Sequence, residues 1–348
     1  MNTFFIEFRD PLFGIIIFFV LVFIISISLY WWTKYLNKEK LKSLDKFLKD
    51  LRQTPSTKEM QSLVSEGNLS EKSWILLAGL YAKNGDFEKS IEIYNELLKI
   101  NNASNSREIL FLLGRTYFKA GFLERAKQIF LNMLKNNPRT PEALRYLLLV
   151  YEYMRDFDSA FEVLEPLDEL KHDIVLDAHY LRAMKLLNDH SIDVEKKTAQ
   201  LLDIYKQDGD LTYMVFEYLF RVDPEYAWKN FDASKSFLLI DILWLVDPAK
   251  LDLDIISQNS FLKELYTARG DIKDVSKSGV FELDVLINLD NKSNATLSFE
   301  YICDNCKQVF PFSFHRCSSC HAIDTVGVDI SLVKSHARIE SEENKSFL

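Results

Sequence analysis

Hydrophobic residues follow three different patterns along the chain. Residues 11–32 are continuously apolar and contain no charged residue. From about residue 71 to about residue 270, apolar side chains recur every three or four positions, which is the spacing of amphipathic helices. Residues 271–300 turn towards the alternation of apolar and polar positions that is typical of strands. The patterns predict a mainly α protein with an apolar helix near its start and a small β element near its end.

The apolar segment is long enough, as a helix, to cross the roughly 30 Å hydrocarbon core of a bilayer. Trp31 and Trp32 end this segment and Tyr35 follows it, where an interfacial aromatic belt belongs. A cleavable signal peptide is the alternative, but it requires a positive start and a small-residue cleavage site, and bulky residues follow the segment instead. We therefore expect a single uncleaved transmembrane anchor over residues 1–35.

Basic residues on the C-terminal side of this segment predict its orientation. Cytoplasmic flanks are enriched in lysine and arginine, so the N-terminus is expected in the periplasm and the C-terminal body in the cytoplasm. The basic residues are Lys34, Lys38, Lys40, Lys42, Lys46, Lys49 and Arg52. In a bacterium, this arrangement describes a single-pass protein of the inner membrane.

A repeat of about 34 residues occupies the helical region, and three stretches align on it, at 71–104, 107–140 and 141–174. In each stretch, the first helix carries a large residue and an aromatic residue at corresponding positions. In the first and second stretches, a small residue lies between these two. This order matches the tetratricopeptide signature. The aligned residues are Trp74, Ala78 and Tyr81, then Leu110, Gly114 and Tyr117, then Leu144, Leu148 and Tyr151.

Weaker helical periodicity over 175–270 predicts degenerate repeats, which would extend one α-solenoid over residues 36–270. Gly85 and Gly121 lie where each helix pair reverses direction. Thr140 and Pro141 predict the cap and the first position of a helix.

The only four cysteines lie near the C-terminus in the pattern C-x2-C-x10-C-x2-C: Cys303, Cys306, Cys317 and Cys320. Two C-x-x-C pairs this close fit one tetrahedral thiolate site, in which the metal ion is zinc or iron. A disulfide pair is the alternative, but cytoplasmic thiols stay reduced. Cys320 also precedes His321, as in c-type haem attachment, which would leave the first pair without a role. His315 and His321 flank the site.

The remaining C-terminal boundaries follow from these motifs. We expect a linker and a strand at 271–300, a small metal-binding domain of the zinc-ribbon or rubredoxin type at 301–330, and a polar tail at 331–348.

The net charge of −9 argues against nucleic acid as a partner, because nucleic-acid binding needs a basic footprint. The sequence contains no G-x-x-x-x-G-K-[ST], H-E-x-x-H or G-x-S-x-G motif. We expect no catalytic residue, no enzymatic activity and no bound cofactor other than the metal ion.

An anchor, tetratricopeptide repeats and a double C-x-x-C motif, in this order, resemble the lipopolysaccharide assembly protein B family of Gram-negative bacteria. The most specific segment is YICDNCKQVFPFSFHRCSSC, in which Tyr301 leads into the first C-x-x-C turn. The resemblance implies that the metal element is rubredoxin-like and packs on the repeats. The chain departs from the family pattern at Lys307, where glycine is common, and at Ser318, where proline is common.

The resemblance also implies a function. Members of the family are adaptors on the cytoplasmic side of the inner membrane that control lipopolysaccharide synthesis. They promote degradation of the deacetylase that commits precursors to lipid A by a membrane-bound AAA+ protease, and they respond to an inner-membrane regulator. The alternatives are a generic membrane-tethered scaffold for another envelope complex and a rubredoxin-type redox protein. Both the adaptor and the scaffold are compatible with a homo-oligomer.

In tetratricopeptide repeats the first helix of each pair lines a concave groove, which predicts a partner-binding surface. Its basic and aromatic residues suit a peptide or protein partner better than a small apolar ligand. The candidates are Lys83 in the first repeat, Phe111, Arg115, Phe118 and Lys119 in the second, and Arg145, Glu152 and Tyr153 in the third.

Overall fold

The computed structural model describes residue 23 and residues 70–100, 106–290 and 294–334. Almost all of the anchor predicted for residues 1–35 therefore lies outside the described residues. Within the described residues, no helix combines the length and the apolar character that a membrane span requires.

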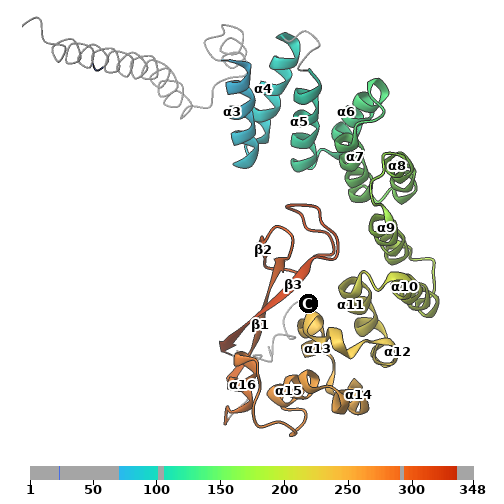
Figure 1. The fold of residues 1–348 in the computed structure, drawn as a ribbon, viewed down its shortest axis with the longest axis vertical. Helices are drawn as coiled ribbons and strands as arrows, with labels where there is room; N and C mark the ends of the chain where they lie inside the picture. Colours follow the sequence, from blue (N-terminus) through green and yellow to red (C-terminus); the bar gives the residue numbers. More distant parts are fainter. Residues whose placement is uncertain (1–22, 24–69, 101–105, 291–293, 335–348) are drawn as a thin grey trace, which may run out of the picture. The chain divides into compact units, whose positions relative to one another are not determined.

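The chain divides into two compact units, Met1–Arg125 and Ala126–Leu348. In the described part of the first unit, α3 (Glu71–Lys83) packs against α4 (Phe87–Ile100), and α4 packs against α5 (Ser106–Lys119) (Figure 1). The next helix, α6 (Leu123–Asn136), begins at the end of this unit and continues into the second. The helices and the turns between them fall where the repeat frame predicts.

Local chemistry explains the bounds of these helices. Ser70 caps α3 by accepting a hydrogen bond from the backbone N–H of Ser73. Gly85 and Gly121 have φ of 86° and 80°, the left-handed conformation that glycine adopts most easily, so the predicted reversals are confirmed. Pro141 is the first residue of α7 (Pro141–Tyr153), as predicted, but the Thr140 side chain makes no capping hydrogen bond and instead donates to the carbonyl of Asn137.

The second unit continues as helices that pack mainly on their neighbours in the sequence. They are α7 (Pro141–Tyr153), α8 (Phe157–Glu169), α9 (Val175–Asn188), α10 (Val194–Asp208), α11 (Thr212–Val222), α12 (Pro224–Asn230), η1 (Ala233–Leu239), α13 (Ile240–Leu245), η2 (Pro248–Lys250), α14 (Leu253–Gln258), α15 (Ser260–Arg269) and α16 (Phe281–Ile287).

Helix α16 lies inside the segment 271–300 that was predicted as a linker and a strand. Leu283 and Leu286 are buried one turn apart on this helix, and Asp284 accepts a hydrogen bond from the backbone N–H of Ser278. The short helix therefore has an apolar face, which the alternating pattern of the surrounding residues concealed.

Three antiparallel strands follow: β1 (Ala295–Cys303), β2 (Val309–Phe310) and β3 (Val326–Lys334), in the order β2-β1-β3. Cys303 pairs with Val326, and Tyr301 pairs with both Phe310 and Val328. Strand β1 crosses the boundary predicted at residue 301, and β3 extends into the segment predicted as a polar tail.

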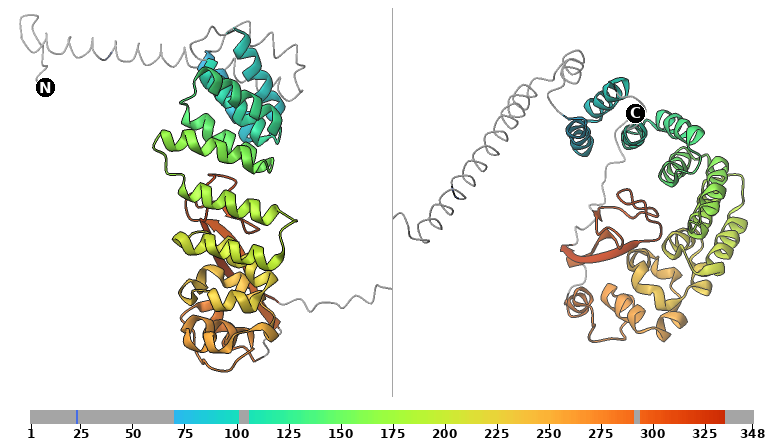
Figure 2. Two further views of the ribbon diagram at one scale, coloured as in Figure 1. Left: turned by 90° about the vertical axis from the view of Figure 1, so that its right-hand side faces the viewer. Right: turned by 45° about the horizontal axis from the view of Figure 1, so that its top comes forward.

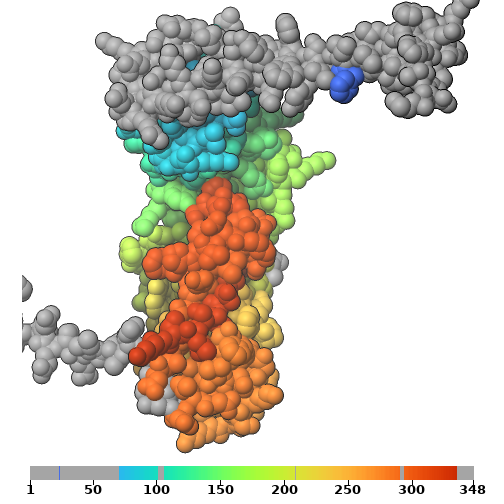
Figure 3. Space-filling model, turned by 90° about the vertical axis from the view of Figure 1, so that its left-hand side faces the viewer, coloured from blue at the N-terminus to red at the C-terminus, as the bar shows by residue number. Residues whose placement is uncertain are grey.

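The sheet shares one hydrophobic core with the helices of the second unit. Leu297 and Val326 on the strands belong to the same buried cluster as Trp228, Phe216 and Tyr266 on the helices. In the right-hand view of Figure 2 the strands lie inside the curve of the helices of this unit, nearest to the helices drawn in yellow. We call the strands and the loops between them, residues 294–334, the metal element. Figure 3 shows the side of this element that faces away from the helices, in orange to red, at the surface. The C-terminal element is therefore built into the helical unit rather than tethered to it.

Candidate metal centre and its contacts with the helices

The four predicted cysteines converge on one point. Their sulfur atoms all lie within 4.8 Å of one another. The Sγ atoms of Cys303 and Cys320 are 3.6 Å apart, and those of Cys306 and Cys317 are 3.7 Å apart. A tetrahedron with metal–sulfur bonds of about 2.3 Å has edges of about 3.8 Å. The four cysteines can therefore hold one metal ion, and zinc and iron both accept this geometry.

Two similar backbone turns bring the sulfur atoms together. After the first C-x-x-C pair, the N–H of Lys307 donates to the carbonyl of Cys303, and after the second the N–H of His321 donates to the carbonyl of Cys317. Lys307 and His321 have φ of 59° and 63°, the left-handed region that disfavours residues with a side chain. Lys307 therefore adopts the conformation that a glycine would favour, and the turn forms at a cost in backbone strain.

Hydrogen bonds to sulfur favour the thiolate form at two of the four positions. Burial raises the pKa of Cys303, but contacts with the Thr325 hydroxyl and with backbone N–H groups outweigh it and lower this pKa to about 6. At Cys320 burial is likewise outweighed, chiefly by the amide of Asn305, and the pKa is lowered. Burial dominates at Cys317 and raises its pKa to about 12. A thiol in this state releases its proton to solvent when a metal ion binds its sulfur, because the cation compensates the charge of the thiolate.

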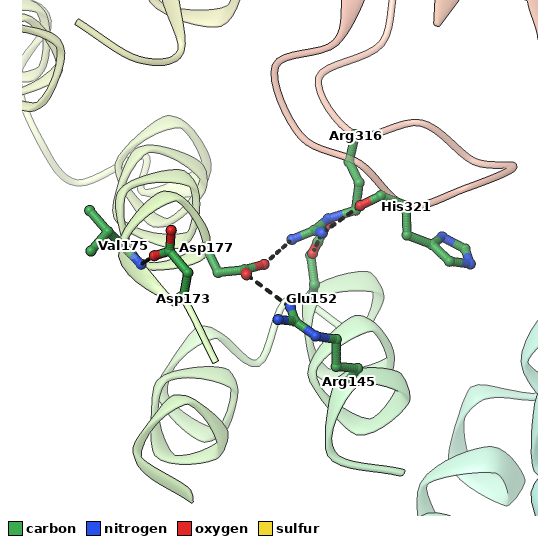
Figure 4. Close-up of polar contacts among 7 residues, drawn as sticks. All are labelled: Arg145, Glu152, Asp173, Val175, Asp177, Arg316 and His321. Atoms are coloured by element: carbon green, nitrogen blue, oxygen red, sulfur yellow. Dashed lines mark hydrogen bonds and ion pairs between the residues drawn. The ribbon is translucent and has the colours of Figure 1, made fainter. Parts of the chain in front are cut away.

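Arg316, next to Cys317, is the main polar contact between the metal element and the helices (Figure 4). Its Nε lies 2.9 Å from Oε2 of Glu152 on α7, and its Nη2 lies 3.2 Å from Oδ1 of Asp177 on α9. The guanidinium stacks 4.8 Å from the ring centroid of Tyr180 and donates to the carbonyl of His321. The side chains of all three charged partners are at most 10% exposed, so this is a buried ion cluster.

The cluster extends beyond Arg316. Asp177 accepts a second hydrogen bond from a charged donor, Arg145. Glu152 also accepts a hydrogen bond from the neutral Tyr180 hydroxyl. Burial raises the pKa of Glu152, although the charge of Arg316 acts in the opposite direction. The positive charge of Arg316 therefore offsets the free-energy cost of burying the charged carboxylates of Glu152 and Asp177.

Two further contacts attach the metal element to α11. His315 Nε2 lies 2.6 Å from Oε2 of Glu217. Burial acts to raise the pKa of Glu217, but the hydrogen bond and charge of His315 outweigh it and lower this pKa. Asp324 accepts a hydrogen bond from the backbone N–H of Leu211, the residue before α11. His315 flanks the metal ligands in the sequence, and the structure directs its ring to Glu217.

A third contact surrounds Asp241 on α13. Oδ2 of this buried carboxylate accepts hydrogen bonds from the hydroxyls of Tyr213, at 2.5 Å, and Tyr301, at 2.9 Å. Burial raises the pKa of Asp241, and the two hydroxyls partly offset the shift. Tyr301, which leads into the first C-x-x-C turn, thus joins β1 to the helices.

The residues predicted to line a partner groove have different environments. Arg145 and Glu152 bind Asp177 and Arg316 within the chain, so their charges already have partners. Phe118 is buried. Tyr153 is 51% exposed, Lys83 and Lys119 are exposed, and Phe111 and Arg115 are half-buried. Binding of a partner by these residues stays a prediction.

The sequence did not reveal the residues that hold the metal element and the helices of the second unit together. Arg316, Glu217, Asp241 and Asp324 belong to no motif, and their partners lie far away in the sequence. The one available signal was Arg316 itself, a charged residue directly before a metal ligand.

Similarities to known proteins agree with this architecture. Residues 71–104 match the tetratricopeptide repeat model. Lipopolysaccharide assembly protein B of Escherichia coli K12 is 25% identical over 170 residues, which cover 48% of this chain and 40% of that protein. The chain carries a tetratricopeptide repeat and resembles lipopolysaccharide assembly protein B. The aligned region spans less than half the length of that relative.

Other proteins are similar over different shares of the chain. Photosystem I assembly protein Ycf3 of Synechococcus sp. CC9605 is 37% identical over 76 residues, 21% of this chain and 44% of that protein. A solved tetratricopeptide repeat protein from Parabacteroides merdae ATCC 43184 is 16% identical, with a TM-score of 0.38, over 72% of this chain and 98% of that one.

Proposed function

We propose that the protein is an adaptor anchored in the bacterial inner membrane that regulates lipopolysaccharide synthesis from the cytoplasmic side. The observation that carries this proposal is the similarity to lipopolysaccharide assembly protein B. The adaptor promotes proteolysis of the deacetylase that commits precursors to lipid A, by a membrane-bound AAA+ protease. An inner-membrane regulator acts through the anchor. The protein itself is not an enzyme in this proposal.

In this function the metal ion has a structural role. Cys303, Cys306, Cys317 and Cys320 would hold one zinc or iron ion, and the sheet that carries them shares its core with the helices. Metal binding supplies folding free energy to elements that are too small to fold alone. The metal element would then fix the inner surface of the helical unit on which partners bind.

The test is the lifetime of the deacetylase in the source bacterium. Depletion of the protein should lengthen the half-life of the deacetylase several-fold, and expression of the wild-type chain should restore it. A variant with all four cysteines replaced by serine should fail to restore it although it reaches the membrane. An unchanged deacetylase half-life after depletion would refute the adaptor function and favour a scaffold for another envelope complex.

A further inference from the structure

Two neighbouring cavities lie where the metal element meets the helices of the second unit. The first, about 450 Å³, lies between α11, α13 and the Tyr301 end of β1. The second, about 400 Å³, lies between α7, α9 and the loop that leads to Arg316. Glu217 and Ser313 line both cavities, so the two adjoin, and we name the pair of cavities the seam groove.

The first cavity has an apolar wall and an exposed apolar lip. Phe220, Ile242 and Val246 line the wall, and Leu245 beside them is 77% exposed. Tyr213 and Tyr301 also line this cavity, and their hydroxyl groups donate hydrogen bonds to the buried Asp241. An exposed leucine beside an apolar cavity favours a ligand that brings a large aliphatic or aromatic side chain.

The accessible charge of the seam groove is mainly positive. Arg221 and Lys250 are exposed in the first cavity, and Arg155 is exposed in the second. The exposed carboxylate among the lining residues is Asp247, and its oxygen accepts the N–H of Ala249. The other carboxylates are buried or paired: Asp241 with two tyrosines, Glu152 with Arg316, and Glu217 with His315. A cationic groove in a chain of net charge −9 suits an acidic ligand.

We propose that the seam groove binds an extended, acidic peptide segment of a client protein. A large apolar side chain of the segment enters the first cavity against Leu245, and acidic residues face Arg221, Lys250 and Arg155. Where the cavities meet, the Ser313 hydroxyl donates to Glu217, which also binds His315, and the Ser313 oxygen offers an acceptor for an N–H group of the peptide backbone. This assignment rests on the proposed adaptor function, and it moves the client site from the first three repeats to the contact with the metal element.

Selection from a random peptide library tests the chemistry without assuming a client. The full-length, metal-loaded protein in detergent is used to select from displayed peptides of about twelve residues, and the enriched peptides are synthesised with a fluorophore for anisotropy titration. We expect peptides that combine a large apolar residue with at least two acidic residues, and affinity that falls as salt rises. Leu245→Asp and the double variant Arg221→Glu with Lys250→Glu should each weaken binding at least tenfold.

Matched controls come from exposed residues outside the groove. Leu253, which is 61% exposed on α14, and Lys229, exposed on α12, do not line either cavity. Leu253→Asp and Lys229→Glu should change the affinity less than twofold. Failure to enrich any peptide, enrichment of basic peptides, or equal losses in the control variants would overturn the proposal.

Two outcomes separate this inference from the adaptor function. If Leu245→Asp abolishes peptide binding but the deacetylase is still degraded at the wild-type rate, the adaptor function stands and the assignment of clients to the groove falls. If binding appears only after residues 335–348 are removed, the groove belongs to the chain's own tail, which carries Glu340, Glu342 and Glu343, and the proposal is overturned.

Discussion

Replacement of Arg316 by methionine should loosen the metal element from the helices without removing the metal ion. Methionine keeps much of the length of the side chain but has neither charge nor hydrogen-bond donors. Glu152 and Asp177 would then remain buried, at 6% and 10% exposure, without the cation between them. Cys317 would keep its place, because its N–H bonds to the carbonyl of Ala322 rather than to the arginine.

The expected loss of stability in Arg316→Met follows from the hydrogen-bond partners that Glu152 and Asp177 keep. Removing one member of a buried ion cluster costs about 3–5 kcal/mol, because the opposite charges stay buried. Asp177 keeps its bond to Arg145, and Glu152 keeps its bond to the Tyr180 hydroxyl, so the lower end, about 3 kcal/mol, is appropriate. At about 1.4 kcal/mol for each factor of ten, the local opening equilibrium should rise about 100-fold.

Hydrogen exchange on the metal-loaded protein measures this opening directly. Amides of β1 and of the loop around Arg316 should lose about two orders of magnitude of protection, while those of α3 and α4 stay unchanged. Lys185→Met is the control, because it removes an ion pair with Asp158 in which both side chains are largely exposed, and such pairs contribute about 0–1 kcal/mol. A loss of protection in Arg316→Met no larger than in the control would refute the reasoning.

The loss of stability caused by Arg316→Met should also depend on pH in a defined direction. Burial raises the pKa of Glu152, so the folded state binds this proton more tightly than the unfolded state, and stability falls as pH rises through the folded pKa. Without Arg316 the pKa rises further. The stability difference between wild type and Arg316→Met should therefore be larger at about pH 8 than at about pH 5.

Three further predictions concern the metal centre and the Asp241 contact. Replacing all four cysteines by serine should abolish binding of one metal ion per chain, measured by elemental analysis, and remove hydrogen-exchange protection from residues 295–334 while most of the helical circular dichroism remains. Lys307→Gly relieves a left-handed backbone with φ of 59° and should stabilise the metal element by about 1 kcal/mol, visible as slower metal loss to a chelator; faster loss would contradict this. Tyr213→Phe removes a donor to buried Asp241 and should lower stability by about 1.5–3 kcal/mol in thermal unfolding, more at high pH because the carboxylate is then charged; an unchanged unfolding temperature would contradict it.

The parts of the fold that the sequence predicts are those with local causes. The helices, the reversals at Gly85 and Gly121 and the grouping of four cysteines each follow from residues close together in the chain. Two C-x-x-C turns must each aim two sulfur atoms at one point, and the short spacer leaves few ways to arrange them.

The contacts between the metal element and the helices have no such local cause. Arg316 reaches Glu152 and Asp177 across more than a hundred residues, and each of these charges reads in the sequence as an ordinary surface residue. Because Glu152 falls on the inner face of its repeat, the repeat frame assigned it to a groove for partners. In the structure Glu152 binds Arg316, so the metal element of the same chain occupies that part of the face.

The position of Arg316 links metal binding to the inner surface of the helices. The residue follows the loop that closes the second cavity and directly precedes Cys317, so the turn that would hold the metal also sets where the guanidinium lies. Loss of the metal would free this turn, and the helices would then carry two buried carboxylates without their cation. Since Ser313 and Arg316 also line the seam groove, displacement of this loop would open the second cavity and remove one lining residue, Ser313, from the first. A client site built from both elements would therefore require the metal for its shape, although no ligand of the metal touches the client.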